Sequence, residues 1–87
     1  MKPIIDIKIK AIHNGTQVIV FFENNYGASI IKHKFSYGND EGLFEIAVLK
    51  GTMESWDITY DTPITDDVLG HQTSEDIKNV LEEISNL

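Results

Sequence analysis

The stretch "IIDIKIKAIHNGTQVIVFFE", residues 4–23, decides the fold, because it predicts two antiparallel strands joined by a tight turn. Residues 4–12 alternate between apolar and charged side chains, which is the period of a strand with one buried face. The dipeptide Asn14-Gly15 follows and favours a two-residue type I′ turn, in which both central residues have positive φ. Residues 16–23 continue as a second apolar strand.

The register of this hairpin is predicted from the turn. With Asn14-Gly15 as the two-residue loop, Ile7 faces Phe22 and the other inward pairs are also apolar. Because side chains alternate with a period of two, a slip by one residue would turn the apolar set away from the core. The turn chemistry and the face pattern therefore predict the same register.

Three more strands and a C-terminal helix complete the pattern. The strands are predicted at residues 28–36, 43–50 and 55–60, with turn-forming residues between them. A stripe of apolar residues with helical spacing predicts a helix over residues 74–86: Ile77, Val80, Leu81, Ile84 and Leu87. We therefore expect residues 1–87 to form a single α+β domain, an antiparallel five-stranded meander with one C-terminal helix packed on a face.

The third strand is expected to follow a four-residue turn at residues 24–27. This turn pairs Phe22 with Ser29 and points Lys32 and Lys34 outward. A slip by one residue would carry both lysines into the core, where an unpaired charge is costly. The sequence therefore predicts that the two lysines lie on the outer face of the sheet.

The charge of the chain is strongly negative and unevenly placed. The net charge is −7, and all seven basic residues are lysines. Residues 51–87 carry one lysine against nine acids, whereas residues 1–50 are nearly balanced. This charge argues against direct binding to duplex nucleic acid, because the phosphate backbone would repel it. The lack of arginine also removes bidentate recognition of phosphate and carboxylate.

Cysteine content and the first residues exclude further classes. The chain has no cysteine, so neither a disulfide nor a cysteine-based zinc site is possible. Charges at Asp6, Lys8 and Lys10 interrupt the first apolar segment, which therefore resembles neither a signal peptide nor a membrane span. We expect no association with a membrane.

The segment "DTPITDDVLGHQTSED", residues 61–76, is dense in acids and helix-capping residues. Thr65 is expected to cap a single helical turn that Gly70 ends in a left-handed conformation. Thr73 or Ser74 is expected to cap the last helix, with acids in its first turn, where the helix dipole favours negative charge. Capping chemistry accounts for most of this composition.

A metal or acid–base site is the sharper alternative for the same segment. It would use four side chains: Asp61, Asp66, Asp67 and His71. However, the chain has no EF-hand spacing, no HExxH motif and no glycine-rich phosphate loop. Asp57 and Asp61, on one strand, would stand about 13 Å apart, too far to bind one ion. We predict no metal, no other cofactor and no catalytic residue.

Two surfaces are candidates for binding a partner. The first is acidic, and it consists of Asp57, Asp61, Asp66, Asp67 and Glu75. The second is the outer face of the first three strands, where lysines surround apolar side chains: Lys8, Lys10, Ile19, Phe21, Lys32 and Lys34. Such a half-apolar face needs a cover, which lysine stems, a partner, a second copy of the chain or the acidic tail would supply.

Two stretches resemble small uncharacterised proteins of tailed phages and prophages of low-GC Gram-positive bacteria. They are "YGASIIKHKFSYGNDEGLFEIAVLK" and "DITYDTPITDDVLGHQTSEDIKNVLEEI", within about residues 26–85, and "YDTPITDDVLG" is the most specific part. The resemblance implies a phage accessory protein in the cytoplasm of a bacterial host. Such proteins often inhibit or redirect a host protein, and acidic ones sometimes imitate nucleic acid. No functional residues carry over from this group.

These observations favour a non-enzymatic binding protein. The leading hypothesis is that the acidic surface binds and modulates a host or phage protein, and a homodimer is also considered. The second hypothesis is a small-molecule or nucleotide-binding protein that uses the lysine-rich face. An enzyme ranks third, because no catalytic spacing is present.

Overall fold

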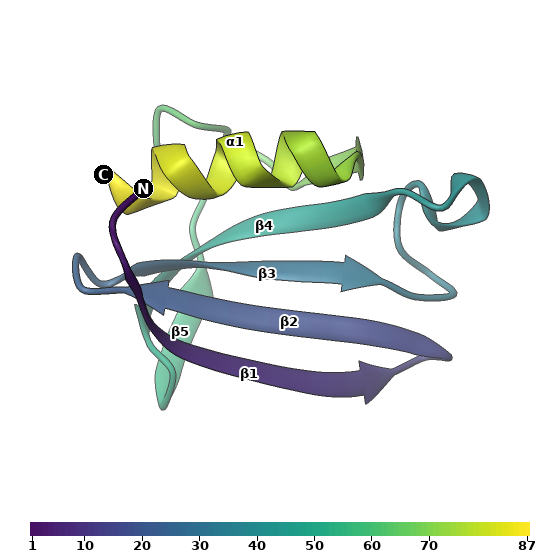
Figure 1. Ribbon diagram of the computed structural model, residues 1–87, viewed down its shortest axis with the longest axis horizontal. Helices are drawn as coiled ribbons and strands as arrows, with labels where there is room; N and C mark the ends of the chain where they lie inside the picture. The colour runs from purple at the N-terminus through teal and green to yellow at the C-terminus, as the bar shows by residue number, and fades with distance from the viewer.

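Five strands run up and down in sequence before a single helix covers part of one sheet face (Figure 1). The structure is a computed structural model, and it describes residues 1–87. Its elements are β1 (Ile4–Ile12), β2 (Gly15–Phe22), β3 (Tyr26–Lys32), the 3₁₀ helix η1 (Asn39–Glu41), β4 (Phe44–Thr52), β5 (Ser55–Ile58), β6 (Leu69–Gln72) and α1 (Ser74–Ser85). The expected α+β fold, with five antiparallel strands in sequential order and a C-terminal helix, is confirmed. β6 and η1 are additions to it.

The β1–β2 turn is displaced by one residue from its predicted place. His13 and Asn14, with φ of 44° and 61°, are its central residues, so the turn has the predicted positive φ at both positions. The register therefore moves by two residues, and Ile7 faces Val20 instead of Phe22. The predicted pairing is wrong, but a shift of two keeps every side chain on its predicted face.

Close packing explains why Gly15 lies in the strand and not in the turn. A Cβ atom at Gly15 would stand 2.0 Å from the backbone oxygen of Lys32 and 2.4 Å from the Cα of His33. The chain that follows β3 therefore approaches β2 too closely for any side chain at this position. The glycine is required for contact between segments, whereas Asn14 takes the left-handed backbone conformation of the turn.

The β2–β3 connection is also shorter than predicted. Residues 23–25 form the turn, Asn25 has a positive φ of 65°, and Val20 pairs with Ala28. Relative to the prediction the register moves by three residues, an odd number, so the faces of β3 exchange. Lys32 consequently lies on the helix side of the sheet, where it pairs with Thr16.

Lys32 tolerates this face because it ends its strand. Its side chain is half-buried, and its Nζ lies 5.6 Å from the centre of the Phe44 ring. A long lysine stem can pass along apolar surface while its ammonium group remains near solvent. The prediction that Lys32 lies on the outer face is therefore wrong, and the helix side accepts this lysine because its charge does not enter the centre of the core.

The helix side of the sheet holds the larger core. Val80 and Ile84 of α1 pack on the buried residues of three strands: Val20, Phe22, Ala28, Ile46 and Val48. This contact confirms the apolar stripe predicted for the helix. Full burial of one large aliphatic or aromatic side chain contributes about 1.5–3 kcal/mol, so this cluster is a major source of stability.

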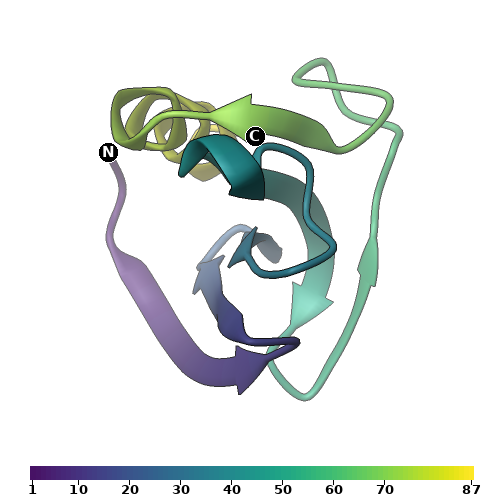
Figure 2. The ribbon, with the colours of Figure 1, turned by 90° about the vertical axis from the view of Figure 1, so that its right-hand side faces the viewer.

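The opposite face of the sheet is covered by the β4–β5 hairpin. Ile19, Phe21 and Leu49 are buried on this face, and Met53 and Trp56 pack against them. Figure 2 shows the strong curvature of the sheet, with β1 on the left and β5 on the right of the view. The β4–β5 hairpin therefore covers the apolar outer face. The sequence suggests lysine stems, a partner, a second copy or the acidic tail as the cover, but not this hairpin.

β5 and β6 share one edge of β4. β5 pairs with the second half of β4, and β6 pairs with the first half. The chain leaves β4 after the Thr59 N–H donates to the Val48 carbonyl at 2.9 Å. Figure 2 shows the intervening segment, residues 59–68, swinging away from the sheet at the upper right. Half of the acidic stretch is therefore an excursion between two strands.

The single helical turn expected after Thr65 is absent, and β6 begins at Leu69 instead. Gly70 does not act as a left-handed stop, and the positive φ of 55° belongs to His71. Gly70 faces Tyr37, and a Cβ atom at this glycine would lie 2.7 Å from the Tyr37 Cβ. Strand pairing and this close contact outweigh the local capping signals.

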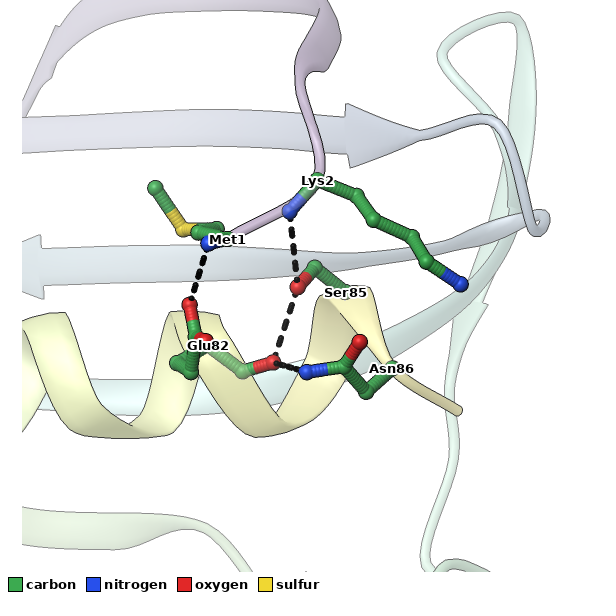
Figure 3. Close-up of polar contacts among 5 residues, drawn as sticks. All are labelled: Met1, Lys2, Glu82, Ser85 and Asn86. Atoms are coloured by element: carbon green, nitrogen blue, oxygen red, sulfur yellow. Dashed lines mark hydrogen bonds and ion pairs between the residues drawn. The ribbon is translucent and has the colours of Figure 1, made fainter.

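The N-terminal residues cross from β1 to the end of α1 (Figure 3). The Met1 ammonium group lies 2.9 Å from Glu82, and the Lys2 N–H donates to the Ser85 hydroxyl at 3.3 Å. Ser85 is buried, and its hydroxyl donates to the Glu82 carbonyl at 2.8 Å. These contacts hold the start of the sheet against the last turn of the helix.

Candidate functional site

Two of the predicted acidic residues line one cleft at the end of β5. The cleft has a volume of about 330 Å³ and is lined by Lys50, Asp57, Ile58, Thr59, Tyr60 and Asp61. β5 positions Asp57 opposite Lys50, and Asp61 follows the point at which the chain leaves β4. The strand ends at Ile58 rather than at residue 60, so the turn of the chain brings Asp61 to the same cleft.

Lys50 does not neutralise the two carboxylates. Its Nζ lies 5.8 Å from the centre of the Tyr26 ring, and no ion pair joins it to Asp57. The single ion pair of the molecule joins the N-terminal ammonium group to Glu82, at the end of α1 (Figure 3). Asp57 and Asp61 are exposed, so their charges are open to a partner.

Apolar side chains accompany the acids in this cleft. Ile58 is 41% exposed and Tyr60 is 48% exposed. Ile58 and Tyr60 alternate along the chain with Trp56, but only Trp56 packs against a core. An exposed tyrosine beside charged groups is a common anchor of protein interfaces, because it buries large area and keeps a polar end. No sequence signal distinguishes these two side chains from core residues.

Asp66 and Asp67 differ in their hydrogen bonds within the loop. The Asp67 N–H donates to the Thr65 hydroxyl at 3.1 Å, and the Asp67 carboxylate accepts from the Val68 N–H at 2.7 Å. Asp67 is therefore a structural residue of the loop. Asp66 is exposed and forms no side-chain hydrogen bond.

Glu75 lies in the first turn of α1 and is exposed. Its neighbour Asp76 completes a capping box with Thr73: the Asp76 carboxylate accepts from the Thr73 N–H at 2.9 Å, and the Thr73 hydroxyl accepts from the Asp76 N–H at 3.1 Å. Hydrogen bonds from Thr73 to the carboxylate, above all the one from its backbone N–H, lower the pKa of Asp76 below its usual value of 3.8. Thr73 is thus confirmed as the N-cap, whereas Glu75 stands outside the cleft of Asp57 and Asp61.

No cluster in the structure has the form of a metal site. No three histidine or carboxylate side chains come close enough to hold an ion. The closest histidines are His13 and His33, whose ring centres lie 5.1 Å apart in an edge-to-face contact. The His33 Nδ1 accepts from the Phe35 N–H at 3.1 Å, and His33 is buried. Their geometry is that of packed aromatic rings.

The predicted lysine-rich face is divided between different parts of the molecule. Lys8 and Lys10 are exposed on the side of Ile19 and Phe21, but the β4–β5 hairpin covers those two apolar residues. The other two lysines lie elsewhere. Lys32 is on the helix side, and Lys34 follows the end of β3, with its Nζ 5.7 Å from the centre of the Phe35 ring.

Comparison of the chain with protein-family models, with curated proteins and with solved structures found no significant match. None of the helices has the length and apolar character that a crossing of the membrane requires. The candidate site therefore rests on its own geometry.

Proposed function

We propose that this protein is a non-enzymatic binding protein whose acidic cleft engages a basic surface on a partner protein. One observation carries the proposal: Asp57 and Asp61 line the same cleft as exposed Ile58 and Tyr60, and no lysine forms an ion pair with either acid. The apolar side chains supply area that a partner can bury, and the acids supply charge complementarity.

The free carboxylates act mainly on association and selectivity. Exposed charges steer an oppositely charged partner and raise the rate of encounter, and this effect weakens as salt increases. The net charge of −7 adds a long-range field of the same sign. Asp66 does not line the cleft, but it is exposed in the segment that follows Asp61 and adds negative charge, whereas the Asp67 carboxylate accepts from the Val68 N–H.

The resemblance of residues 26–85 to phage and prophage proteins supports a proposal for where the protein meets its partner. On that ground we place the partner in the cytoplasm of a bacterial host, where the protein acts as a phage accessory protein and modulates a host or phage protein. The strongly acidic second half of the chain fits a partner with a basic surface.

The test compares two variants of equal charge. The site variant changes Asp57→Asn, Asp61→Asn and Asp66→Asn, and the control variant changes Asp40→Asn, Glu41→Gln and Glu83→Gln. All six acids are exposed and lie outside ion pairs. The wild type captures a partner from bacterial extract, the partner is identified by mass spectrometry and purified, and its affinity for each variant is measured by calorimetry at two salt concentrations.

We expect the site variant to bind at least about tenfold more weakly than the control variant, with a smaller salt dependence. Tyr60→Ala should weaken binding independently of salt, because it removes area rather than charge. Equal losses in the site and control variants would show that only net charge matters. Full affinity in the site variant would place the interface elsewhere on the molecule.

A further inference from the structure

β1 is an edge strand with an unpaired side. It pairs with β2 alone, over nine residues from Ile4 to Ile12. The residues that flank a two-residue type I′ turn exchange backbone hydrogen bonds, and hydrogen-bonded pairs then alternate along the ladder. Counting from Ile12 and Gly15, the backbone N–H and C=O groups of Ile7 and Ile9 therefore point away from β2. A strand with free groups of this kind is a template for another strand.

The side chains of this strand are apolar and exposed. Ile5, Ile7 and Ile9 are 62%, 56% and 66% exposed. Ile7 and Ile9 lie on the face that α1 covers elsewhere, but α1 packs mainly on β3, β4 and β6 and leaves β1 open. Figure 1 shows β1 at the lower edge of the sheet, with the helix over the opposite edge. This apolar row is unlike the exposed face of a solvated strand.

We propose that β1 pairs antiparallel with β1 of a second copy of this chain, about a two-fold axis at Ile7. Two-fold symmetry places Ile7 of one copy opposite Ile7 of the other, as a hydrogen-bonded pair with outward backbone groups. Ile9 of each copy then lies beside the bulge of the other, where regular pairing ends. The two sheets become one continuous sheet, and the exposed isoleucines cover one another.

Charge complementarity selects this register. With the axis at Ile7, Asp6 of each copy lies opposite Lys8 of the other, which makes two pairs of opposite charge. An axis at Ile9 would put Lys8 opposite Lys10 twice, and an axis at Lys8 would put Lys8 opposite itself. Opposite charges stabilise a cross-strand pair and like charges destabilise it, so the register at Ile7 is the most favourable.

The same charges explain why the edge accepts a copy of itself and resists other strands. Lysines on an edge strand normally oppose pairing, because an incoming strand offers no acid at the matching position. β1 carries its own match, since Asp6 and Lys8 lie symmetrically about Ile7. The bulge between Ile4 and Asp6 ends regular pairing on one side and limits the interface to a short segment.

The test measures the mass of the full chain in solution by sedimentation equilibrium and light scattering. A contact of one strand pair is smaller than a standard interface, so concentrations from about 1 μM to 1 mM are needed. We expect a reversible shift from 9.8 kDa to twice that mass. A monomer over the whole range would overturn the proposal.

Charge reversal tests the register. Asp6→Lys alone and Lys8→Asp alone each create two like-charge pairs, so each should weaken the dimer by about tenfold or more. The double variant Asp6→Lys with Lys8→Asp restores opposite charges and should restore the dimer. Asp40→Lys changes the net charge by the same amount as Asp6→Lys at a distant site, and it should leave dimerisation close to the wild type.

Two other outcomes would contradict the proposal. If the double variant stays as weak as the single ones, the register at Ile7 is wrong. If neither single variant changes the dimer, β1 does not form the interface. Far-ultraviolet circular dichroism and the fluorescence emission of Trp56 check that each variant is folded before its mass is interpreted. Ile7→Lys is an independent variant, because it places two like charges at the axis. It should weaken the dimer as much as the single charge reversals do.

Discussion

The side-chain amide of Asn24 donates a hydrogen bond to the backbone carbonyl of Ile84 at 2.9 Å, across 60 positions of the chain. The same Nδ2 group also lies 3.2 Å from the Leu87 carbonyl, and the Asn24 Oδ1 accepts from the Tyr26 N–H at 3.0 Å. One side chain thus shapes the β2–β3 turn and satisfies carbonyl groups at the end of α1. The Ile84 carbonyl also accepts from the Leu87 N–H at 3.2 Å, so Asn24 adds a further donor at a helix end whose last carbonyls lack the usual helical partners.

Loss of this amide should destabilise the protein. Asn24→Ala removes this donor from the end of α1 and leaves the Tyr26 N–H without its acceptor, and we expect a loss of about 1–3 kcal/mol in the free energy of unfolding, measured by urea denaturation. Asn24→Asp should be worse, because a carboxylate would face the negative end of the helix dipole. Asn79→Ala, on the exposed surface of α1, is the control and should change stability little. Equal effects at positions 24 and 79 would contradict the role of Asn24.

Gly27 should tolerate no side chain. It lies within β3, and a Cβ atom there would stand 2.1 Å from the Val20 carbonyl oxygen and 2.8 Å from the Phe21 ring. We expect Gly27→Ala to cost about 3 kcal/mol, since backbone and a buried ring must both move. The control is Gly42→Ala, where φ is 74° and the nearest atom is 4.0 Å away. Its cost is about 1–2 kcal/mol from the left-handed conformation alone. Thermal denaturation of both variants should rank Gly27→Ala as the more harmful change.

The capping box of α1 should give the stability a specific acid dependence. Hydrogen bonds from Thr73 lower the pKa of Asp76 below 3.8, so the folded state binds a proton at this site less readily than the unfolded state does. The stabilisation is therefore fully present above pH 3.8 and is lost as the pH falls through the lower pKa of the folded state. Asp76→Asn should be less stable than the wild type at pH 7, and the difference should shrink below about pH 4. A difference independent of pH in urea titrations would contradict this account.

Trp56 should act as a cover for the second core. It packs half-buried against Ile19, Phe21 and Leu49. Trp56→Ala should cost about 2–3 kcal/mol and should increase binding of a hydrophobic dye, because it opens the apolar face of the sheet. Tyr60→Ala, four residues away in the acidic cleft, removes a more exposed aromatic ring and should cost less than about 1 kcal/mol. Unchanged dye binding in the Trp56 variant would show that other residues cover this face.

The acidic cleft shows the limits of prediction for the candidate site. Charge alone identifies Asp57 and Asp61 in the sequence, but it also selects Asp67, whose carboxylate is held by the Val68 N–H, and Glu75, which lies outside the cleft. Ile58 and Tyr60 have the spacing of core residues. They are exposed because the chain leaves β4 directly after Thr59, a point that strand alternation does not reveal.

The sequence by itself determined the local conformations and the fold class. Alternation in residues 4–12, the stripe on the last helix and the Thr73 cap all predict elements that the structure contains, because period and capping depend on neighbours a few residues away. The tertiary structure alone decided the registers and the second core, which the β4–β5 hairpin covers. Gly15 and Gly27 have the appearance of turn residues, yet each lies in a strand where another segment passes within 2.0–2.1 Å of the position of a Cβ atom. Contacts between distant segments set these positions, and a pattern of neighbouring residues contains no record of them.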